Sequence, residues 1–150
     1  MSGPQRSGPN DPYDLERFVT AQDSGGTYQR ALAELHAGRK TSHWMWFIFP
    51  QVAGLGFSAM AQRFAISGLA EARAYLAHPV LGPRLRDCTA LAMSSSRTAL
   101  EIFGPVDAQK FFSCLTLFAC TANDPIFRRA LAQFFSGRHD QGTMTILQTV

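Results

Sequence analysis

Hydrophobic side chains recur at helical spacing along most of the chain, and the clearest examples lie in its last third. After residue 107 and again after residue 124, apolar residues fall at positions i, i+3, i+4 and i+7, which share one face of an α-helix. The two sets are Phe111, Cys114, Leu115 and Phe118, and Phe127, Ala130, Leu131 and Phe134. We therefore expect two amphipathic helices whose apolar faces are buried together.

Residues typical of helix ends separate these stretches. The expected N-caps are short polar side chains that accept hydrogen bonds from free backbone N–H groups: Asp14, Thr27, Ser42, Ser58, Ser67, Asp107, Asp124 and Asp140. The expected stops are Gly25–Gly26, Gly38, Gly104–Pro105 and Gly137, because glycine suits the left-handed position after a helix. No alternating strand pattern is convincing. The pattern predicts an all-α fold, a single compact domain of seven to eight short helices over residues 12–150, after a disordered tail at 1–11.

The segment from Ser42 to Pro50 is ambiguous. Its aromatic and branched residues would suit a buried strand, and its length suits either a strand or a helix. Its neighbours are helical and Ser42 is a candidate N-cap, so we favour a short buried helix that Pro50 ends.

Composition places the chain among ordinary globular domains with an aromatic core. The sequence has 150 residues, 46% hydrophobic, with twelve Phe and two Trp. The formal charge of +3 comes mostly from twelve Arg, and only Arg128 and Arg129 are adjacent. Nucleic-acid binders usually gather basic residues on one face, so the sequence gives no strong nucleic-acid signal. It leaves open a small anionic ligand held by a few arginines.

The cysteines indicate a reducing compartment. Cys88, Cys114 and Cys120 are odd in number and have no C-x-x-C spacing, so neither a disulfide framework nor a zinc site is expected. No apolar run reaches the roughly 18 residues of a membrane span, and no signal core precedes the domain. We expect a cytoplasmic protein with no metal, no cofactor and no membrane association; its oligomeric state is not indicated.

The segment from Lys40 to Ser58 is the first candidate site, because polar groups are set among its aromatic residues. Small planar ligands require apolar walls with a few fixed polar groups, and a glycine loop that enters a helix presents N–H groups to anions. The candidate ligand-binding residues are Lys40, Trp44, Trp46, Gln51, Gly54, Gly56 and Ser58 here, with Arg84 as a second anion contact. The alternative is that these aromatic residues only build the core.

The start of the helix after Asp107 is the second candidate. Lys110 would lie against the Lys40–Ser58 segment, and Asp107 would serve as an acid, a base or an acceptor for a ribose hydroxyl. With His43, these two are the candidate catalytic residues. The alternative is that Asp107 is an N-cap and Lys110 a solvated side chain.

Several motifs together resemble a bacterial family of unknown function, whose members automatic annotation often labels calpastatin. They are the run Lys40–Gln51, Gly54-Leu55-Gly56, His78-Pro79-Val80-Leu81-Gly82, Ile102-Phe103-Gly104 and the stretch Asp107–Phe118. The likeness covers roughly residues 12–148. It implies a mainly helical single domain and supplies no activity.

A second resemblance points to a ligand class. The order His78-Pro79, Leu85, then Phe103-Gly104 and a helix is similar to the C-terminal half of domains that process ADP-ribose adducts and riboflavin-pathway intermediates. Those domains have Asn-Pro-x-Leu and Trp-Gly at these places, so His78 and Phe103 depart from the pattern.

Two functions are compatible with these observations. One is a domain that binds a small nucleotide-like or ADP-ribosyl ligand, with hydrolysis of an N-glycosidic bond if it is an enzyme. The other is a non-enzymatic protein-interaction module with an aromatic core. We predict that His43, Gln51 and Lys110 lie near one concave surface that includes Trp44 or Trp46, an arrangement that would favour the ligand-binding hypothesis.

Overall fold

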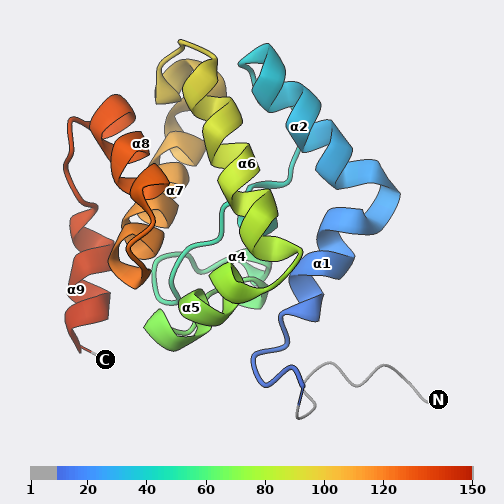
Figure 1. Ribbon diagram of the computed structural model, residues 1–150, viewed down its shortest axis with the longest axis vertical. Helices are drawn as coiled ribbons and strands as arrows, with labels where there is room; N and C mark the ends of the chain where they lie inside the picture. Colours follow the sequence, from blue (N-terminus) through green and yellow to red (C-terminus); the bar gives the residue numbers. More distant parts are fainter. Residues whose placement is uncertain (1–9, 150) are drawn as a thin grey trace.

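The computed structural model describes residues 10–149, and helices account for most of this range (Figure 1). The helices are α1 (Glu16–Asp23), the 3-10 turn η1 (Ser24–Gly26), α2 (Thr27–Ala37), α3 (Met45–Ile48), α4 (Ala59–Arg63), α5 (Leu69–Ala77), α6 (Leu81–Ser94), α7 (Ala99–Thr121), α8 (Pro125–Phe135) and α9 (Gln141–Thr149). The only β-type pairing among the described residues is an isolated parallel bridge between Val52 and Ile66. The predicted all-α fold is confirmed, while most of the expected tail at 1–11 lies outside the described residues.

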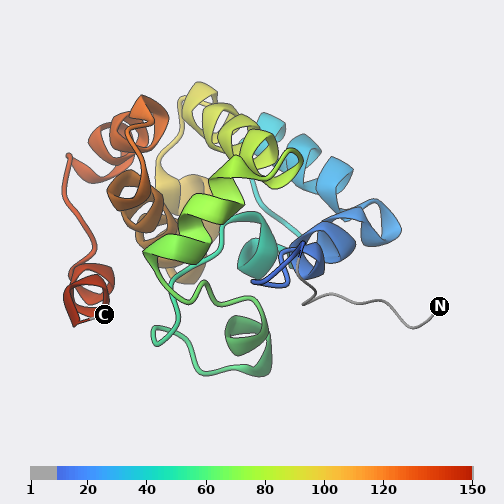
Figure 2. The same cartoon turned by 60° about the horizontal axis from the view of Figure 1, so that its bottom comes forward.

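The helices form one body in which α6 occupies a central position. It packs on α2, on α5 and on α8, while α7 contacts α5, α8 and α9. Figure 1 shows α1 and α2 at one side, α7 and α8 at the other, and α9 outermost beside α7. Figure 2 shows that α4 and the loops around it project below the rest of the domain. This projecting region carries the candidate site.

The two amphipathic helices predicted from the pattern are α7 and α8, and their apolar faces meet. Phe111, Phe118, Phe127 and Leu131 are buried, and the rings of Phe118 and Phe127 lie 5.7 Å apart. Phe134 is half-buried and its ring still contacts Phe111 at 5.4 Å. The predicted register is therefore confirmed, with the last position at the edge of the core.

Some of the predicted helix ends are confirmed. Ser58 accepts from the backbone N–H of Ala61, and Asp124 accepts from that of Ile126 ahead of Pro125. Gly38 ends α2 in the left-handed region at φ 76°. Each of these residues stands directly beside an apolar helical stretch, so local sequence is sufficient to assign it.

Other predicted caps were wrong, because the side chain is engaged elsewhere or the start is shifted. Asp14 has φ 54°, and the N-cap of α1 is Leu15; the N–H groups of Leu15 and Glu16 donate to the Asp11 carboxylate. The N-caps of α2 and α5 are glycines, Gly26 and Gly68, rather than Thr27 and Ser67.

The ambiguous aromatic segment contains one helical turn. Only Met45–Ile48 is helical, and the N-cap is Trp44, without a side-chain cap. Ser42 was wrongly predicted as this cap, because its hydroxyl donates to Glu34 of α2. The helical interpretation is therefore correct for four residues, and the segment on either side is irregular.

Helix α7 is broken near its beginning. Thr98 and Glu101 form a capping box ahead of the first part, and Gly104 then adopts φ 79° and ψ 170°, outside the helical region. Pro105 starts the second part, where its missing N–H would have no helical partner. Asp107 therefore lies inside the first turn after the break, and its prediction as an N-cap was wrong.

Candidate functional site

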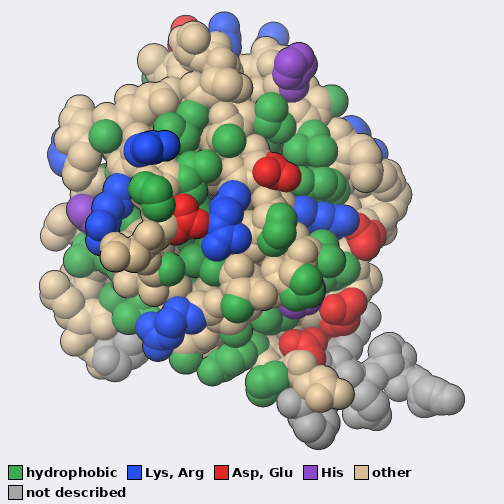
Figure 3. All heavy atoms as spheres, viewed as in Figure 1, with side chains coloured by type: hydrophobic (Ala, Val, Ile, Leu, Met, Phe, Trp, Pro, Cys, Tyr) green, Lys and Arg blue, Asp and Glu red, His purple; other side chains and the backbone are tan. Residues whose placement is uncertain are grey.

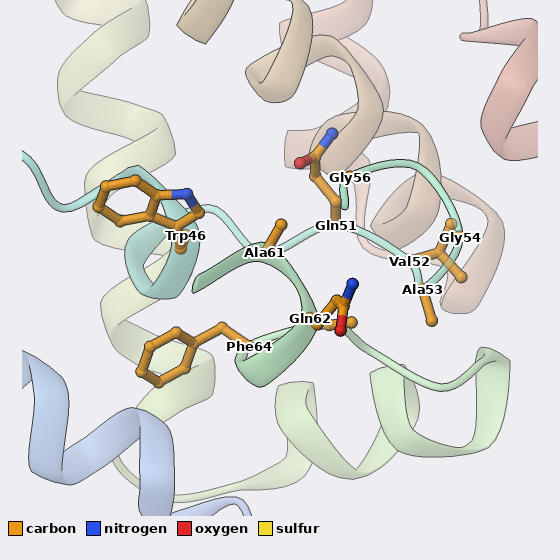
Figure 4. Close-up of a pocket in the computed structure, with 10 residues that line it drawn as sticks. Trp46, Gln51, Val52, Ala53, Gly54, Gly56, Ala61, Gln62 and Phe64 are labelled. Carbon is orange, nitrogen blue, oxygen red and sulfur yellow. The ribbon is translucent and has the colours of Figure 1, made fainter. Parts of the chain in front are cut away.

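A pocket of about 140 Å³ lies between α3, α4 and the loop that joins them (Figure 4). Its lining residues are Trp46, Gln51, Val52, Ala53, Gly54, Gly56, Ala61, Gln62, Phe64 and Ala65. Figure 4 shows Trp46 and Phe64 on one side and Val52, Ala53 and Gly54 on the other. A volume of this size is close to that of a cavity of roughly 150 Å³ that takes up benzene. The pocket can therefore hold one small ring.

Close packing of the loop on α4 gives the pocket its shape. A Cβ at Gly56 would lie 2.7 Å from the Cβ of Ala61, so only glycine lets the loop approach α4 this closely. Gly54 has φ 102°, a conformation that favours glycine. The Ala53 N–H donates to Ile66 O at 2.8 Å, which fixes the middle of the loop. Both glycines were predicted as ligand-binding residues, which stays a prediction, and the structure gives each a role in the backbone path of the loop.

Arg17 of α1 fixes the opposite wall of the pocket. Its guanidinium donates to Arg63 O at 2.9 Å and to Ala65 O at 2.8 Å, and it pairs with Glu71 at 3.0 Å. The Glu71 side chain is 4% exposed and also accepts from the backbone and hydroxyl of Ser67. A half-buried, paired guanidinium thus holds the chain just after α4. Sequence reasoning assigned no role to Arg17 or Glu71.

Asp107 lies between two lysines, next to the pocket. One carboxylate oxygen is 2.7 Å from Lys40 Nζ and the other is 3.7 Å from Lys110 Nζ. Lys40 is 7% exposed and also donates to Ser42 O at 2.6 Å, whereas Lys110 is 26% exposed. Two cations share one carboxylate, so this cluster carries a net positive charge, and Lys110 is its accessible member.

Each lysine also lies over a tryptophan. Lys110 Nζ is 5.2 Å from the ring of Trp46, which connects the charged cluster to the pocket wall. Lys40 Nζ is 5.0 Å from the ring of Trp44, a fully buried residue. Trp46 is half-buried, and its indole N–H donates a hydrogen bond to no residue from 10 to 149. Trp46 can therefore face a ligand, whereas Trp44 supports the core beneath Lys40.

Glu34 of α2 organises the chain that leads to this cluster. It accepts hydrogen bonds from the N–H groups of Thr41 and Ser42, from the Ser42 hydroxyl and from the Trp44 indole, at 2.5–3.0 Å. Burial alone would raise the pKa of Glu34, but these hydrogen bonds outweigh it and lower the pKa to about 2. Glu34 thereby holds Ser42 where Lys40 reaches its carbonyl. This role could not be predicted from the sequence, because a Glu on an amphipathic helix is usually a surface residue.

The backbone completes the placement of Lys40. Its N–H donates to Ile102 O at 2.8 Å, in the part of α7 that precedes the Gly104 break. Together with the ion pair to Asp107, this bond joins the segment before α3 to both parts of α7. The predicted approach of Lys110 and Asp107 to the Lys40–Ser58 segment is seen in the geometry.

The remaining predicted site residues lie apart from the pocket lining. Ser58 caps α4 from an exposed position. His43 is exposed beside Trp44 and is not among the residues that line the pocket. Arg84 pairs with Asp23 at 2.8 Å and lies over the ring of Tyr28, so its contacts are with the α1–α2 region. Of the three residues expected to share one concave surface, Gln51 lines the pocket and Lys110 lies over its Trp46 wall.

Metal and membrane features are not evident in the described chain. Among residues 10–149 no group of three or more His, Cys, Asp or Glu side chains is placed to hold a metal ion. No helix within this range is long and apolar enough to cross a membrane. On the face drawn in Figure 3, Lys and Arg side chains are dispersed among hydrophobic and acidic ones.

Comparison with known proteins gives a family and a structural relative. The structure is similar to the crystal structure of the conserved hypothetical protein Rv1873 from Mycobacterium tuberculosis, with 47% sequence identity and a TM-score of 0.89. The match covers 93% of this chain and 100% of that one. No curated protein sequence matches. The model of a family described as "Protein of unknown function (DUF1810)" matches residues 12–147, and the chain therefore belongs to that family.

Proposed function

We propose that this domain binds a small nucleotide-like ligand, in particular an ADP-ribosyl compound, in the pocket beside Trp46. The observation that carries the proposal is the adjacency of a ring-sized pocket to an incompletely neutralised lysine. A nucleotide combines a planar ring with an anionic group. The pocket and Lys110 offer one complementary feature for each.

The pocket is large enough for the ring of the ligand but not for the whole ligand, so the rest would lie on the surface. Pockets that enclose a whole drug-sized ligand span roughly 300–1,000 Å³, and this one has about 140 Å³. A base would therefore enter beside Trp46, where the Gln51 amide and the Gln62 amide oxygen would bind its edge, since Gln62 Nε2 already donates to Phe57 O at 2.9 Å. The sugar and phosphates would extend outward over the protein.

The charge of the cluster supports an anion at Lys110. Asp107 already has a close cationic partner in Lys40, so the 3.7 Å contact to Lys110 leaves that ammonium incompletely neutralised. Charge-assisted hydrogen bonds to phosphate are about twice as strong as neutral ones. An anion would bind the exposed side of Lys110 without separating Lys40 from Asp107.

We extend the proposal to hydrolysis of an N-glycosidic bond. Water adds to the anomeric carbon, the carbon–nitrogen bond breaks, and the departing nitrogen takes up a proton, so water is the only co-reactant. The transition state resembles an oxocarbenium ion, which a carboxylate such as Asp107 stabilises. Lys110 or the exposed His43 would deliver the proton to the leaving group. The three free cysteines fit a reducing, cytoplasmic setting for such an activity.

One observation favours an interaction module as a second candidate. Phe57, in the loop that carries the pocket, is 82% exposed, and Val106 beside Asp107 is 69% exposed. Exposed apolar side chains that form a contiguous patch are a common feature of protein-binding surfaces. This function would need Phe57 and would not need the pocket.

A thermal-shift series with four related compounds tests the proposal. AMP and ADP-ribose carry ring and anion, adenosine lacks the anion, and ribose 5-phosphate lacks the ring. We expect AMP and ADP-ribose to stabilise the parent, by about 2.7 kcal/mol at 100 times the dissociation constant. Trp46→Leu and Lys110→Gln should each lose that shift while remaining folded. Release of free base, followed by chromatography, reports hydrolysis.

Arg129→Gln is the matched control for Lys110→Gln. Arg129 is exposed on α8, so its replacement removes one positive charge away from the pocket. This variant should keep the full response to AMP. If none of the four compounds shifts the parent at millimolar concentration, or if Arg129→Gln loses the response as Lys110→Gln does, the proposed site is wrong.

A further inference from the structure

Asp140 is a buried carboxylate whose partners are all neutral. The residue is 8% exposed and forms no ion pair with any residue from 10 to 149. Its oxygens accept from the Gln109 amide at 2.9 Å, the Ser113 hydroxyl at 3.1 Å, and the Thr143 hydroxyl and N–H at 2.6 and 3.0 Å. Its own N–H donates to the Thr116 hydroxyl at 2.9 Å. Burial of a charge without an opposite charge is unfavourable unless hydrogen bonds replace those to water. We call these hydrogen-bond partners, Gln109, Ser113, Thr116 and Thr143, the Asp140 shell. Capping of α9 alone would need only the bonds to Thr143, so it does not explain the bonds to α7.

These partners belong to two helices. Gln109, Ser113 and Thr116 lie on α7, and Thr143 lies in the first turn of α9. Gln109 immediately precedes Lys110 on α7, in the same turn as Asp107. Asp140 is therefore hydrogen-bonded to the part of α7 that also carries Asp107 and Lys110, the charged residues of the candidate site.

Helix α9 in turn rests against the loop that forms the pocket. A Cβ at Gly54 would lie 3.3 Å from Ile146 Cδ1, and a Cβ at Gly142 would lie 3.2 Å from Leu55 Cδ2. Two positions of α9 thus touch two consecutive residues of the loop. The support is close, because a Cβ at either glycine would require the neighbouring side chain to move by a few tenths of an ångström.

We infer that Asp140 is a positioning residue that holds the pocket loop in register with the Asp107–Lys110 pair. It does so by joining α7, which carries the pair, to α9, which supports the loop. The ring-binding and anion-binding halves of the site come from distant parts of the sequence, and Asp140 sets the distance between them. The effect on ligand binding rests on the proposed function, whereas the coupling of α7 to α9 rests on the contacts of Asp140 alone.

Amide hydrogen exchange measured by NMR tests the mechanism without any ligand. The reporter is the Ala53 N–H in the pocket loop, and the reference is the amides of α2, on the opposite side of the domain. Thr143→Val removes the 2.6 Å hydroxyl bond with little change of volume, and Thr143→Ser keeps the hydroxyl. We expect exchange at Ala53 to accelerate several-fold more than in α2 for Thr143→Val and for Asp140→Asn, and Thr143→Ser to resemble the parent.

Two further variants separate positioning from general loss of stability. Ile146→Ala leaves the Asp140 shell intact but removes the contact with Gly54, so it should also accelerate exchange at Ala53 selectively. Asp124→Ala removes the N-cap of α8, and its effect should be equal at Ala53 and in α2. If Thr143→Val and Asp140→Asn accelerate all amides equally, as Asp124→Ala does, Asp140 has only a general structural role and the inference is overturned.

Binding of AMP adds a second readout. Thr143→Val should weaken AMP binding, whereas Thr143→Ser and Asp124→Ala should retain it at a temperature where all are folded. A parent protein that binds none of the compounds would contradict the proposed function, while exchange at Ala53 would still decide the role of Asp140. Full AMP affinity in Thr143→Val, in a parent that does bind AMP, would overturn the positioning role.

Discussion

The ammonium group of Lys40 and the carboxylate of Asp107 form a 2.7 Å ion pair that joins the segment before α3 to α7. Lys110 approaches the same carboxylate only to 3.7 Å and is more exposed. The chain has two lysines, and the sequence alone does not distinguish their roles. In the structure their roles differ. Lys40 is a component of the fold, and Lys110 is available to a ligand.

Replacement of the two lysines should separate stability from binding. Lys40→Met leaves Asp107 and Ser42 O without their close partner and should lower the free energy of unfolding by about 1–3 kcal/mol. Lys110→Met removes a more exposed charge and should change it by less than about 0.5 kcal/mol. Urea unfolding followed by circular dichroism measures both. Equal losses would mean that Lys110 is as much a part of the fold as Lys40.

Glu34 should make the stability depend on pH at the acidic end. Its pKa in the folded protein is about 2, below the value of about 4.3 expected for an unfolded chain. Its stabilising contribution is thus complete above the unfolded pKa and is lost as the pH falls toward 2. The parent should exceed Glu34→Gln in urea midpoint at pH 7, and the difference should shrink between pH 5 and pH 2. A difference that stays constant over this range would contradict the role assigned to the carboxylate.

Replacement of Gly56 by alanine, which adds only a methyl group, should be enough to disturb the pocket. Gly56→Ala places a methyl group 2.7 Å from Ala61, so the loop must move away from α4 and the pocket must change shape. AMP binding should fall, as measured by titration calorimetry. The double variant Gly56→Ala/Ala61→Gly removes the clash and should recover affinity, although Gly in α4 lowers helix stability by about 1 kcal/mol. Failure of the double variant to recover any affinity would count against this steric reason.

Phe118 tests the register of α7. It is fully buried, and its ring lies 5.5 Å from that of Tyr75 and 5.7 Å from that of Phe127. Phe118→Ala should lower the free energy of unfolding by about 3–5 kcal/mol, as measured by denaturant titration. A loss below about 1 kcal/mol would contradict its place in the core.

The three cysteines should differ in reactivity. Cys88 and Cys114 are buried, and burial raises the pKa of Cys88 to about 12 and that of Cys114 well above the usual value. Cys120 is exposed, although partial burial of its thiol raises its pKa as well. Titration of the native protein with a thiol reagent should therefore modify one cysteine, and Cys120→Ser should abolish that reaction. Modification of a second thiol without denaturant would mean that the core opens more readily than its packing implies.

Helical periodicity was sufficient to predict the core formed by α7 and α8, because the spacing of Phe111 and Phe118 in α7, and of Phe127 and Leu131 in α8, depends only on local helix geometry. Capping was less predictable. Ser42 has the right chemistry for an N-cap, but its hydroxyl is taken by Glu34, a partner that only the folded chain brings near. Local signals therefore predict an element better than they predict its ends.

The candidate site was predictable where its chemistry is contiguous in sequence. Trp46, Gln51 and the two loop glycines fall in one run, and a dense mixture of aromatic and polar residues is visible without a structure. Glu34 and Asp140 were assigned no part in it, because each acts through hydrogen bonds to other elements. The sequence shows these residues, but their hydrogen-bond partners become clear only in the folded structure.

The break at Gly104 has a consequence for anyone who would redesign this domain. In a continuous helix the Ile102 carbonyl would accept from the N–H four residues later, whereas here it accepts from Lys40. An idealised backbone, with position 104 made helical, would raise the helix content and leave no acceptor for the chain that carries Lys40. Such a design would look more favourable by local helix propensity. It would also remove the hydrogen bond that positions Lys40 for its ion pair with Asp107, so the break at Gly104 should be retained.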